Sequence, residues 1–202
     1  VPGNEYSSRA SISADGRCVA FDSIASNLVL GDTNGSTDAC VRNLMAGATE
    51  RVSVDSAGAQ ATHASGNAWI SEDGRLVAFS SLAANLVSGD TNLAGDVFLR
   101  DRLAGTTERL SVDSAGAEGN GQSIDGSIAP DGRFVTFFSN ATNLVPGDTN
   151  GVQDIFVRDR QAGTTERVSL TSGGVQGNST SIRPAITPDG RYVAFSSFAT
   201  NL

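Results

Sequence analysis

A repeat of 58 residues constrains this sequence more than any other feature. The tripeptide Asp-Gly-Arg begins at Asp15, Asp73, Asp131 and Asp189, each time 58 residues after the previous copy. Gly-Asp-Thr-Asn and Thr-Glu-Arg recur in the same register. Such a period indicates a protein built from one supersecondary unit used several times. The chain, 1–202, therefore reads as one domain segment with three full copies and a half copy, at 1–58, 59–116, 117–174 and 175–202.

Each copy reads as four short β-strands. Pro130-Asp131-Gly132 is typical of a tight turn, and Ala162-Gly163-Thr164 of a hairpin turn. No stretch has a 3.6-residue apolar period, so we expect little helix. The middle strands are apolar on both faces, as expected where each small sheet packs between two neighbours. These features predict an all-β fold, a β-propeller of four-stranded blades. In the third copy the predicted strands are 126–129, 133–139, 154–160 and 165–170.

Two segments carry a family resemblance. Ile186–Ser197 reads Ile-Thr-Pro-Asp-Gly-Arg-Tyr-Val-Ala-Phe-Ser-Ser, and Asp154–Asp159 reads Asp-Ile-Phe-Val-Arg-Asp. Together they resemble the TolB-type, WD-like propeller repeat of bacterial envelope proteins, over essentially the whole chain. The resemblance implies a propeller and an extracellular, cell-surface or periplasmic location. It leaves the function open, because propellers include binding modules, peptidase domains and lyases.

Both the repeat length and the repeat count depart from the usual propeller. Propeller repeats usually run about 40–50 residues, and the extra residues here lie in 141–153 and 171–182, where we expect function to reside. Three and a half blades fall below the usual minimum of about four. We therefore expect that the chain is a segment of a longer array or is completed by another chain. The edge of the half blade is then an assembly surface.

An acidic loop recurs in every full copy, at 31–38, 89–96 and 147–154. It places Asp, Asn and Asp at positions 1, 3 and 7, and calcium prefers such oxygen ligands in a flexible loop. The alternative is structural, because Asp and Asn also form Asx-turns and cap hairpins. The candidate calcium ligands are Asp32, Asn34, Asp38, Asp90, Asn92, Asp96, Asp148, Asn150 and Asp154.

Three other features carry predictions. Cys18 and Cys40 replace bulky residues in adjacent strands of the first copy, which favours a cross-strand disulfide and an oxidising compartment over two buried thiols. The repeated Glu-Arg pair beginning at Glu50 predicts cross-strand ion pairs with the preceding strand. Trp69 replaces a small residue on the first strand, which lines the centre of a propeller. It serves either as packing or as a platform for a ligand.

Composition limits the function. The net charge of −8 excludes a nucleic-acid partner, and no apolar run is long enough to insert in a membrane. All 14 basic residues are Arg and the chain has one His, which leaves no nucleophile–base pair to name. We therefore expect a non-catalytic extracellular or periplasmic scaffold that binds proteins or further copies of itself. The alternatives are a calcium-dependent adhesion or glycan-binding module, and the propeller part of a peptidase or polysaccharide lyase.

Overall fold

The computed structural model describes residues 2–202, with the exception of the side chain of Asp125. The described residues form fourteen strands and no helix, which confirms the all-β prediction. No described segment is a helix of the length and apolarity needed to cross a membrane. The strands are β1 (Ser7–Ile12), β2 (Cys18–Ser23), β3 (Asp38–Asn43), β4 (Ala48–Arg51), β5 (Ser65–Ile70), β6 (Leu76–Ser81), β7 (Asp96–Asp101), β8 (Thr106–Arg109), β9 (Ser123–Ile128), β10 (Phe134–Ser139), β11 (Asp154–Asp159), β12 (Thr164–Arg167), β13 (Ser181–Ile186) and β14 (Val193–Ser197).

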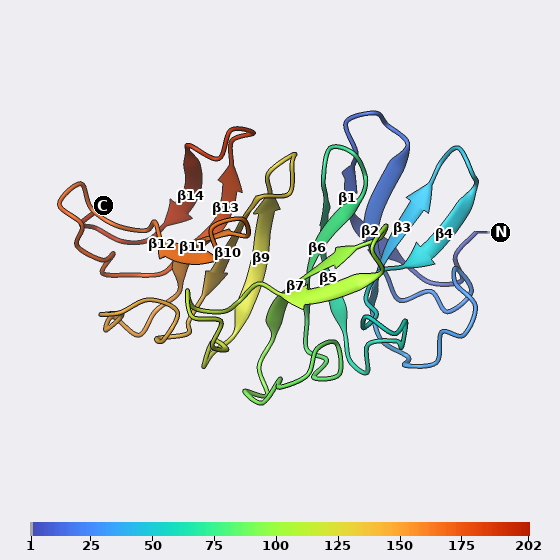
Figure 1. Ribbon diagram of the computed structural model, residues 1–202, viewed down its shortest axis with the longest axis horizontal. Coiled ribbons are helices and arrows are strands. Elements are labelled where there is room, and N and C mark those ends of the chain that lie inside the picture. The colour runs from blue at the N-terminus through green and yellow to red at the C-terminus, as the bar shows by residue number, and fades with distance from the viewer. Residues whose placement is uncertain (1) are drawn as a thin grey trace.

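Each full copy folds into one antiparallel four-stranded sheet with its strands in chain order, and β13 and β14 form a two-stranded sheet. The sheets lie side by side along the longest axis of the molecule (Figure 1). The first strands of successive sheets contact one another, β1 with β5, β5 with β9 and β9 with β13. These strands form one edge of every sheet, so they line the axis about which the sheets are arranged.

The core lies between the sheets. One cluster joins Ala20 and Val41 of the first sheet to Phe79 and Phe98 of the second. A second cluster repeats it between the second and third sheets. The rings of Phe79 and Phe98 stack with centroids 5.8 Å apart and are fully buried. Both faces of the middle strands are thus covered, as their two-sided apolar pattern predicts.

The glycine of Asp-Gly-Arg has two structural roles. Gly74 has a φ of +72° in its turn, a conformation that side chains with a Cβ disfavour. A Cβ built there would also lie 3.2 Å from the Cβ of Cys18 in the preceding sheet. Gly132 approaches Leu76 in the same way. The turn therefore both reverses the chain and packs against the preceding sheet.

The structure moves two strand boundaries of the third copy by three residues and four others by one residue. The first strand begins at Ser123 rather than residue 126, because pairing with β10 continues through an irregularity at its centre. The fourth strand ends at Arg167 rather than residue 170. Val168 still donates to the carbonyl of Ile155, but Leu170 turns out of the sheet and bridges to Gln176.

The predicted disulfide between Cys18 and Cys40 is wrong, because both cysteines are free and buried. In the β2–β3 ladder Cys18 pairs with Asn43, and Cys40 pairs with Phe21. Cys18 and Phe21 are three residues apart on one strand, so the two thiols lie on opposite faces of the sheet. Burial raises the pKa of the Cys40 thiol to about 12. Both cysteines therefore act as small apolar residues, and they carry no argument for an oxidising compartment.

Candidate functional site

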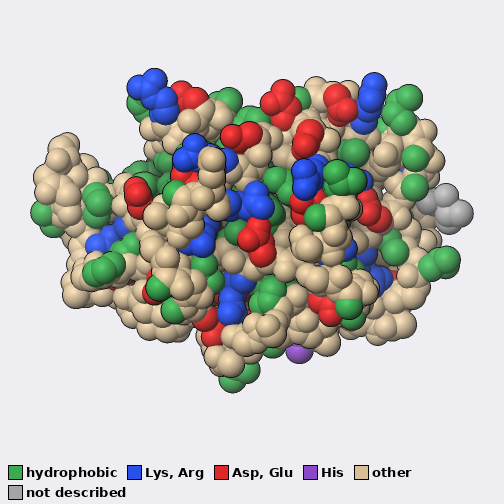
Figure 2. All heavy atoms as spheres, in the orientation of Figure 1, with side chains coloured by type: hydrophobic (Ala, Val, Ile, Leu, Met, Phe, Trp, Pro, Cys, Tyr) green, Lys and Arg blue, Asp and Glu red, His purple; other side chains and the backbone are tan. Residues whose placement is uncertain are grey.

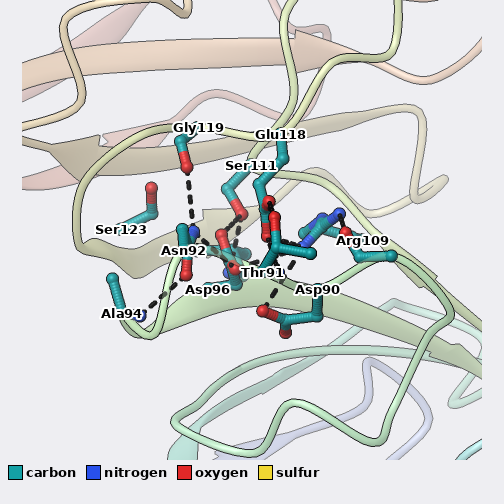
Figure 3. Close-up of polar contacts among 12 residues, drawn as sticks. Asp90, Thr91, Asn92, Ala94, Asp96, Arg109, Ser111, Glu118, Gly119 and Ser123 are labelled. Carbon is teal, nitrogen blue, oxygen red and sulfur yellow. Dashed lines mark hydrogen bonds and ion pairs between the residues drawn. The ribbon is translucent and has the colours of Figure 1, made fainter.

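The acidic loops are occupied by arginine. In the second sheet, Arg109 extends from β8 into the loop that precedes β7, where Nη1 lies 3.7 Å from Asp90 and 3.4 Å from Asp96 (Figure 3). The same nitrogen also binds Glu118. Asp96 is fully buried and accepts a hydrogen bond from Ser111 Oγ. The guanidinium therefore lies among three carboxylates and balances part of their charge.

The asparagine of the loop is a structural residue. Asn92 Nδ2 donates to Asp96 Oδ2 at 3.1 Å and to the carbonyl of Gly119 at 2.8 Å. Its Oδ1 accepts the amide of Ala94 at 2.7 Å, which closes an Asx-turn. Both ends of this amide are thus engaged within the protein. The predicted Asx-turn is present, and the amide oxygen is committed to it.

The other two loops repeat this arrangement with fewer acids. Arg51 lies 2.9 Å from Asp38 and 3.6 Å from Asp32. Arg167 lies 3.1 Å from Asp148 and 3.2 Å from Asp154. Asn34 and Asn150 also donate to the last aspartate of their loops. The structure therefore brings all nine predicted residues into three equivalent clusters, each with an arginine that the prediction did not include.

The cluster around the second loop contains one acidic residue that the other two clusters lack. Glu118 adds a third carboxylate where the other copies have Gln60 and Gln176. Asp90, Asp96 and Glu118 can place one oxygen each within 4.8 Å of one another, the one such group in the described part of the chain. Burial and the neighbouring Asp96 raise the pKa of Asp90 to about 6. A comparison of the three copies at this position would have identified Glu118. Calcium binding at the loops stays a prediction.

The repeated Glu-Arg pair does not form the predicted ion pairs within one sheet. Glu50 binds Arg102 of the second sheet, and Glu108 binds Arg160 of the third at 2.7 Å. These glutamates therefore join neighbouring sheets. The arginine beside each glutamate holds the acidic loop instead.

The chain's one histidine lies beside a threonine. His63 is exposed in a loop at the lower edge of the view in Figure 2, and its Nδ1 lies 3.1 Å from Thr62 Oγ1. That hydroxyl donates its proton to Asn85 Oδ1 at 3.1 Å. The side chains of His63, Thr62 and Asn85 therefore form one hydrogen-bonded group in this loop.

A hollow lies along the first strands, where the prediction named Trp69 alone as a residue that a ligand could contact. Its volume is about 450 Å³ and its lining includes Tyr6, Arg9, Asn67 and Gln122. A second hollow of about 290 Å³ shares Arg9 and Asn67 and is flanked by Trp69. We call these five residues the axial rim. Cavities of a few hundred Å³ lined by convergent polar groups are typical binding sites.

The backbone of the axial rim is strained in a repeated way. Arg9, Asn67 and Arg183 occupy one repeat position and have φ of 52°, 55° and 55°. Each lies at a break in the register of its first strand. Buried Asp22 holds the second of these breaks by accepting the amide of Asn67 at 2.9 Å and that of Ala68 at 3.2 Å. Bulges of this kind redirect a side chain and occur beside functional sites.

The chemistry of the axial rim changes from copy to copy. The residue that corresponds to Arg9 is Asn, Asp and Arg in the second, third and fourth copies. The residue that corresponds to Trp69 is Ser, Ser and Ala in the first, third and fourth copies. Tyr6 likewise corresponds to Ala, Gln and Thr. In β2 and β3, by contrast, most changes exchange one apolar residue for another. The rim positions of the first strand therefore change in chemistry between copies more than the core positions of the second and third strands do.

Comparison with known proteins supports the fold. TolB from Acinetobacter baumannii superposes with a TM-score of 0.60 and 18% identity, over 98% of this chain and 39% of that chain. A putative TolB from Agrobacterium tumefaciens superposes with a TM-score of 0.60 and 22% identity, over 96% and 54%. The chain has a TolB-like β-propeller fold. The predicted propeller and the predicted resemblance are thereby confirmed at the level of fold.

Other comparisons limit what the TolB-like fold implies. The tricorn protease superposes with a TM-score of 0.54 and 15% identity, over 96% of this chain and 19% of that chain. The fold is therefore shared with a protease and does not decide whether the chain is an enzyme. No protein-family model and no curated protein matches the sequence. This chain spans 39% and 54% of the two TolB structures, so it corresponds to part of each.

Proposed function

We infer that this TolB-like propeller is a non-catalytic scaffold that binds a protein partner at the axial rim. The observation that carries this proposal is the divergence of the first strands at the rim positions, while the Asp, Asn and Arg residues of the acidic clusters are identical in the three full copies and most core positions stay apolar. A surface that only maintained the fold would tolerate the same residue in each copy. The rim instead offers an aromatic ring at Tyr6, a cation at Arg9 and an amide at Asn67.

The location that accompanies this proposal is extracellular, at the cell surface or in the periplasm. It is supported by the likeness to the two TolB structures. The cysteines no longer support it, since both are free.

Site-specific photocrosslinking tests the proposal. A photoreactive amino acid is placed at Tyr6 or Gln122 on the rim, and at Met45 or Leu103 as controls. The two controls are 78% and 79% exposed in hairpin turns, and neither lines the two hollows of the rim. In an envelope extract of the organism that encodes the chain, the rim positions should give a discrete crosslinked protein and the controls should not. Equal crosslinking from rim and turn positions would contradict the proposal.

A glycan is the second candidate ligand, favoured by one residue. Trp69 is 42% exposed beside Arg9 and Asn67, and an exposed indole stacks on the apolar face of a sugar ring. Because Trp69 is the one tryptophan in the chain, its fluorescence reports directly on this place. A saturable change on titration with a neutral oligosaccharide such as chitotetraose, lost in Arg9→Ala, would favour the glycan over the protein partner.

A further inference from the structure

A buried carboxylate, Asp22, lies at the wall of the axial rim. It belongs to β2, is 3% exposed and lines the larger of the two hollows. The other buried aspartates among the described residues, Asp38, Asp96 and Asp154, each form an ion pair with an arginine. Asp22 forms no ion pair within the described part of the chain. Its charge is held by backbone amides of the second sheet instead.

The two amides that bind Asp22 belong to the bulge of β5. Asn67 N–H donates to Oδ2 at 2.9 Å, and Ala68 N–H donates to Oδ1 at 3.2 Å. Asn67 has a φ of +55°, and the β5–β6 register breaks between Gly66 and Trp69. A strained backbone of this kind persists only where its surroundings hold it. The carboxylate therefore fixes the backbone conformation from which the Asn67 side chain enters the rim.

The residues around Asp22 are adapted to its carboxylate. A Cβ built on Gly66 would lie 2.9 Å from Asp22 Oδ2, so the carboxylate fits because this position is a glycine. The other copies have serine or isoleucine there. In the third copy Phe138 replaces Asp22, and the residue that corresponds to Ala68 in the following sheet is Pro184, which has no amide to donate. The carboxylate, the glycine and the amides thus form one unit between the first and second sheets.

Few titratable groups face Asp22. From β1, the charge of Arg9 favours the ionised carboxylate. From β5, the carboxylate meets a glycine and two amides, and that strand has no titratable side chain. In β3, Asp38 lies on the opposite face of the sheet, and the Cys40 thiol keeps its proton because its pKa is about 12. Protonation of Asp22 is therefore coupled to two amides and one guanidinium.

Protonation of Asp22 has two opposite effects. Burial raises the pKa of this carboxyl, while the amides of Asn67 and Ala68 and the charge of Arg9 oppose the rise. Because these contacts favour the ionised form, they are weaker when the carboxyl is neutral. The neutral carboxyl also avoids the cost of a buried charge, so its contribution to stability is present in acid and is lost as the pH rises through the folded-state pKa. Protonation therefore releases the bulge without unfolding the sheet.

We propose that Asp22 is a positioning residue of the axial rim and makes partner binding at the rim depend on pH. The ionised carboxylate holds Asn67 in the conformation that binds the partner, and protonation in mild acid releases it. Arg9 is released in the same step, because it donates to Asn67 Oδ1 and is attracted to the carboxylate. The effect on binding rests on the proposed function, whereas the switch is a property of the free protein.

Trp69 reports on the switch without a partner. It resumes the pairing after the bulge and is the one tryptophan in the chain. Its fluorescence and its quenching by acrylamide are recorded on the full chain as the pH falls from about 8 to about 4. We expect a protonation step with a midpoint above 3.8, the ordinary pKa of an aspartate. Asp22→Asn, which cannot ionise, and Asp22→Ser, the residue of two other copies, should both lack this step.

Gly66→Ala is a variant that keeps the carboxylate and displaces it. The new Cβ weakens the amide bonds to Asp22, so the midpoint should rise. Circular dichroism verifies that each variant is folded. If Asp22 served the fold alone, its variants would unfold at a lower temperature and keep the pH profile of the original chain. The inference is overturned if an Asp22 variant keeps the step, if the original chain has no step above pH 3.8, or if Gly66→Ala leaves the midpoint unchanged.

Photocrosslinking from Gln122 connects the switch to binding. The yield should fall about tenfold between neutral pH and a pH below the midpoint, since a hydrogen bond to a charged group is lost. Asp22→Asn should give the low yield at both pH values. An unchanged yield across the step seen at Trp69 would overturn the effect on binding. If Gln122 crosslinks no protein at any pH, the rim function is wrong, and the Trp69 titration still decides whether Asp22 controls the bulge.

Discussion

Replacing Arg109 by methionine should destabilise the second sheet strongly. The guanidinium is 10% exposed and faces the carboxylates of Asp90, Asp96 and Glu118, which are 4%, 0% and 16% exposed. Removing one partner of a buried ion pair leaves an uncompensated charge and costs about 3–5 kcal/mol. Methionine keeps the apolar stem of the side chain to about the position of Nε, so the lost charged group dominates the change.

Arg75→Met is the matched control for this prediction. Arg75 also binds an aspartate, but its side chain is 46% exposed. Exposed pairs contribute about 0–1 kcal/mol. Urea unfolding followed by Trp69 fluorescence reports on the second sheet, which holds both arginines and Trp69. The reasoning is refuted if Arg109→Met loses less than about 1 kcal/mol, or no more than Arg75→Met.

Acidity should modify the cost of Arg109→Met. Burial raises the pKa of Asp90 to about 6 even with Arg109 present, and the arginine opposes that rise. Without the arginine, Asp90 binds a proton still more readily. The destabilisation measured at pH 5 should therefore be smaller than at pH 8, and an equal loss at both pH values would count against an electrostatic cause.

Three further predictions follow from the same geometry. Hydrogen bonds from Arg75 and Arg133 lower the pKa of Asp101 and Asp159 to about 2, so the stability from these pairs is complete above about pH 4. It should fall as the pH drops from about 4 to about 2, and Arg75→Gln should flatten acid unfolding curves in that window. Both cysteines should be modified when the protein is alkylated in denaturant without reductant and analysed by mass spectrometry. In the native protein at pH 8, Cys40 should resist alkylation. A disulfide-linked fragment would contradict the assignment of free thiols. If the loops bind calcium, adding calcium to metal-stripped protein should raise its melting temperature saturably. The free energy of unfolding should rise by about 2.7 kcal/mol at 100 times the dissociation constant. If millimolar calcium does not shift the melting temperature, the arginines alone balance the charge of these loops.

The repeat explains why much of the fold was predictable. Asp-Gly-Arg marks a turn whose glycine needs a positive φ, and the apolar β2 and β3 positions can only be buried between sheets. The boundaries were harder, because the first strand continues through a bulge that residue preferences do not reveal.

The candidate site was predictable only in part. Asx-turn chemistry located the acidic loops, but Arg109 lies 13 residues after Asp96 and reaches it through hairpin pairing. The predicted disulfide was wrong because the strand register places Cys18 and Cys40 on opposite faces of the first sheet. The sequence alone does not determine this register. The axial rim depends on the arrangement of three separate strands, β1, β5 and β9, and the signal for it lay in comparing the copies position by position.

In the proposed function, the axial rim binds a partner while the rest of each repeat maintains the fold. The most direct test combines Arg9→Asn and Trp69→Ser, each a residue that another copy has at that position. Crosslinking from Gln122 and thermal unfolding are then measured on the same protein. The account predicts that crosslinking is lost while the unfolding temperature changes by no more than about 2 °C. Retained crosslinking with a lowered unfolding temperature would show that the rim serves packing, and would contradict the account.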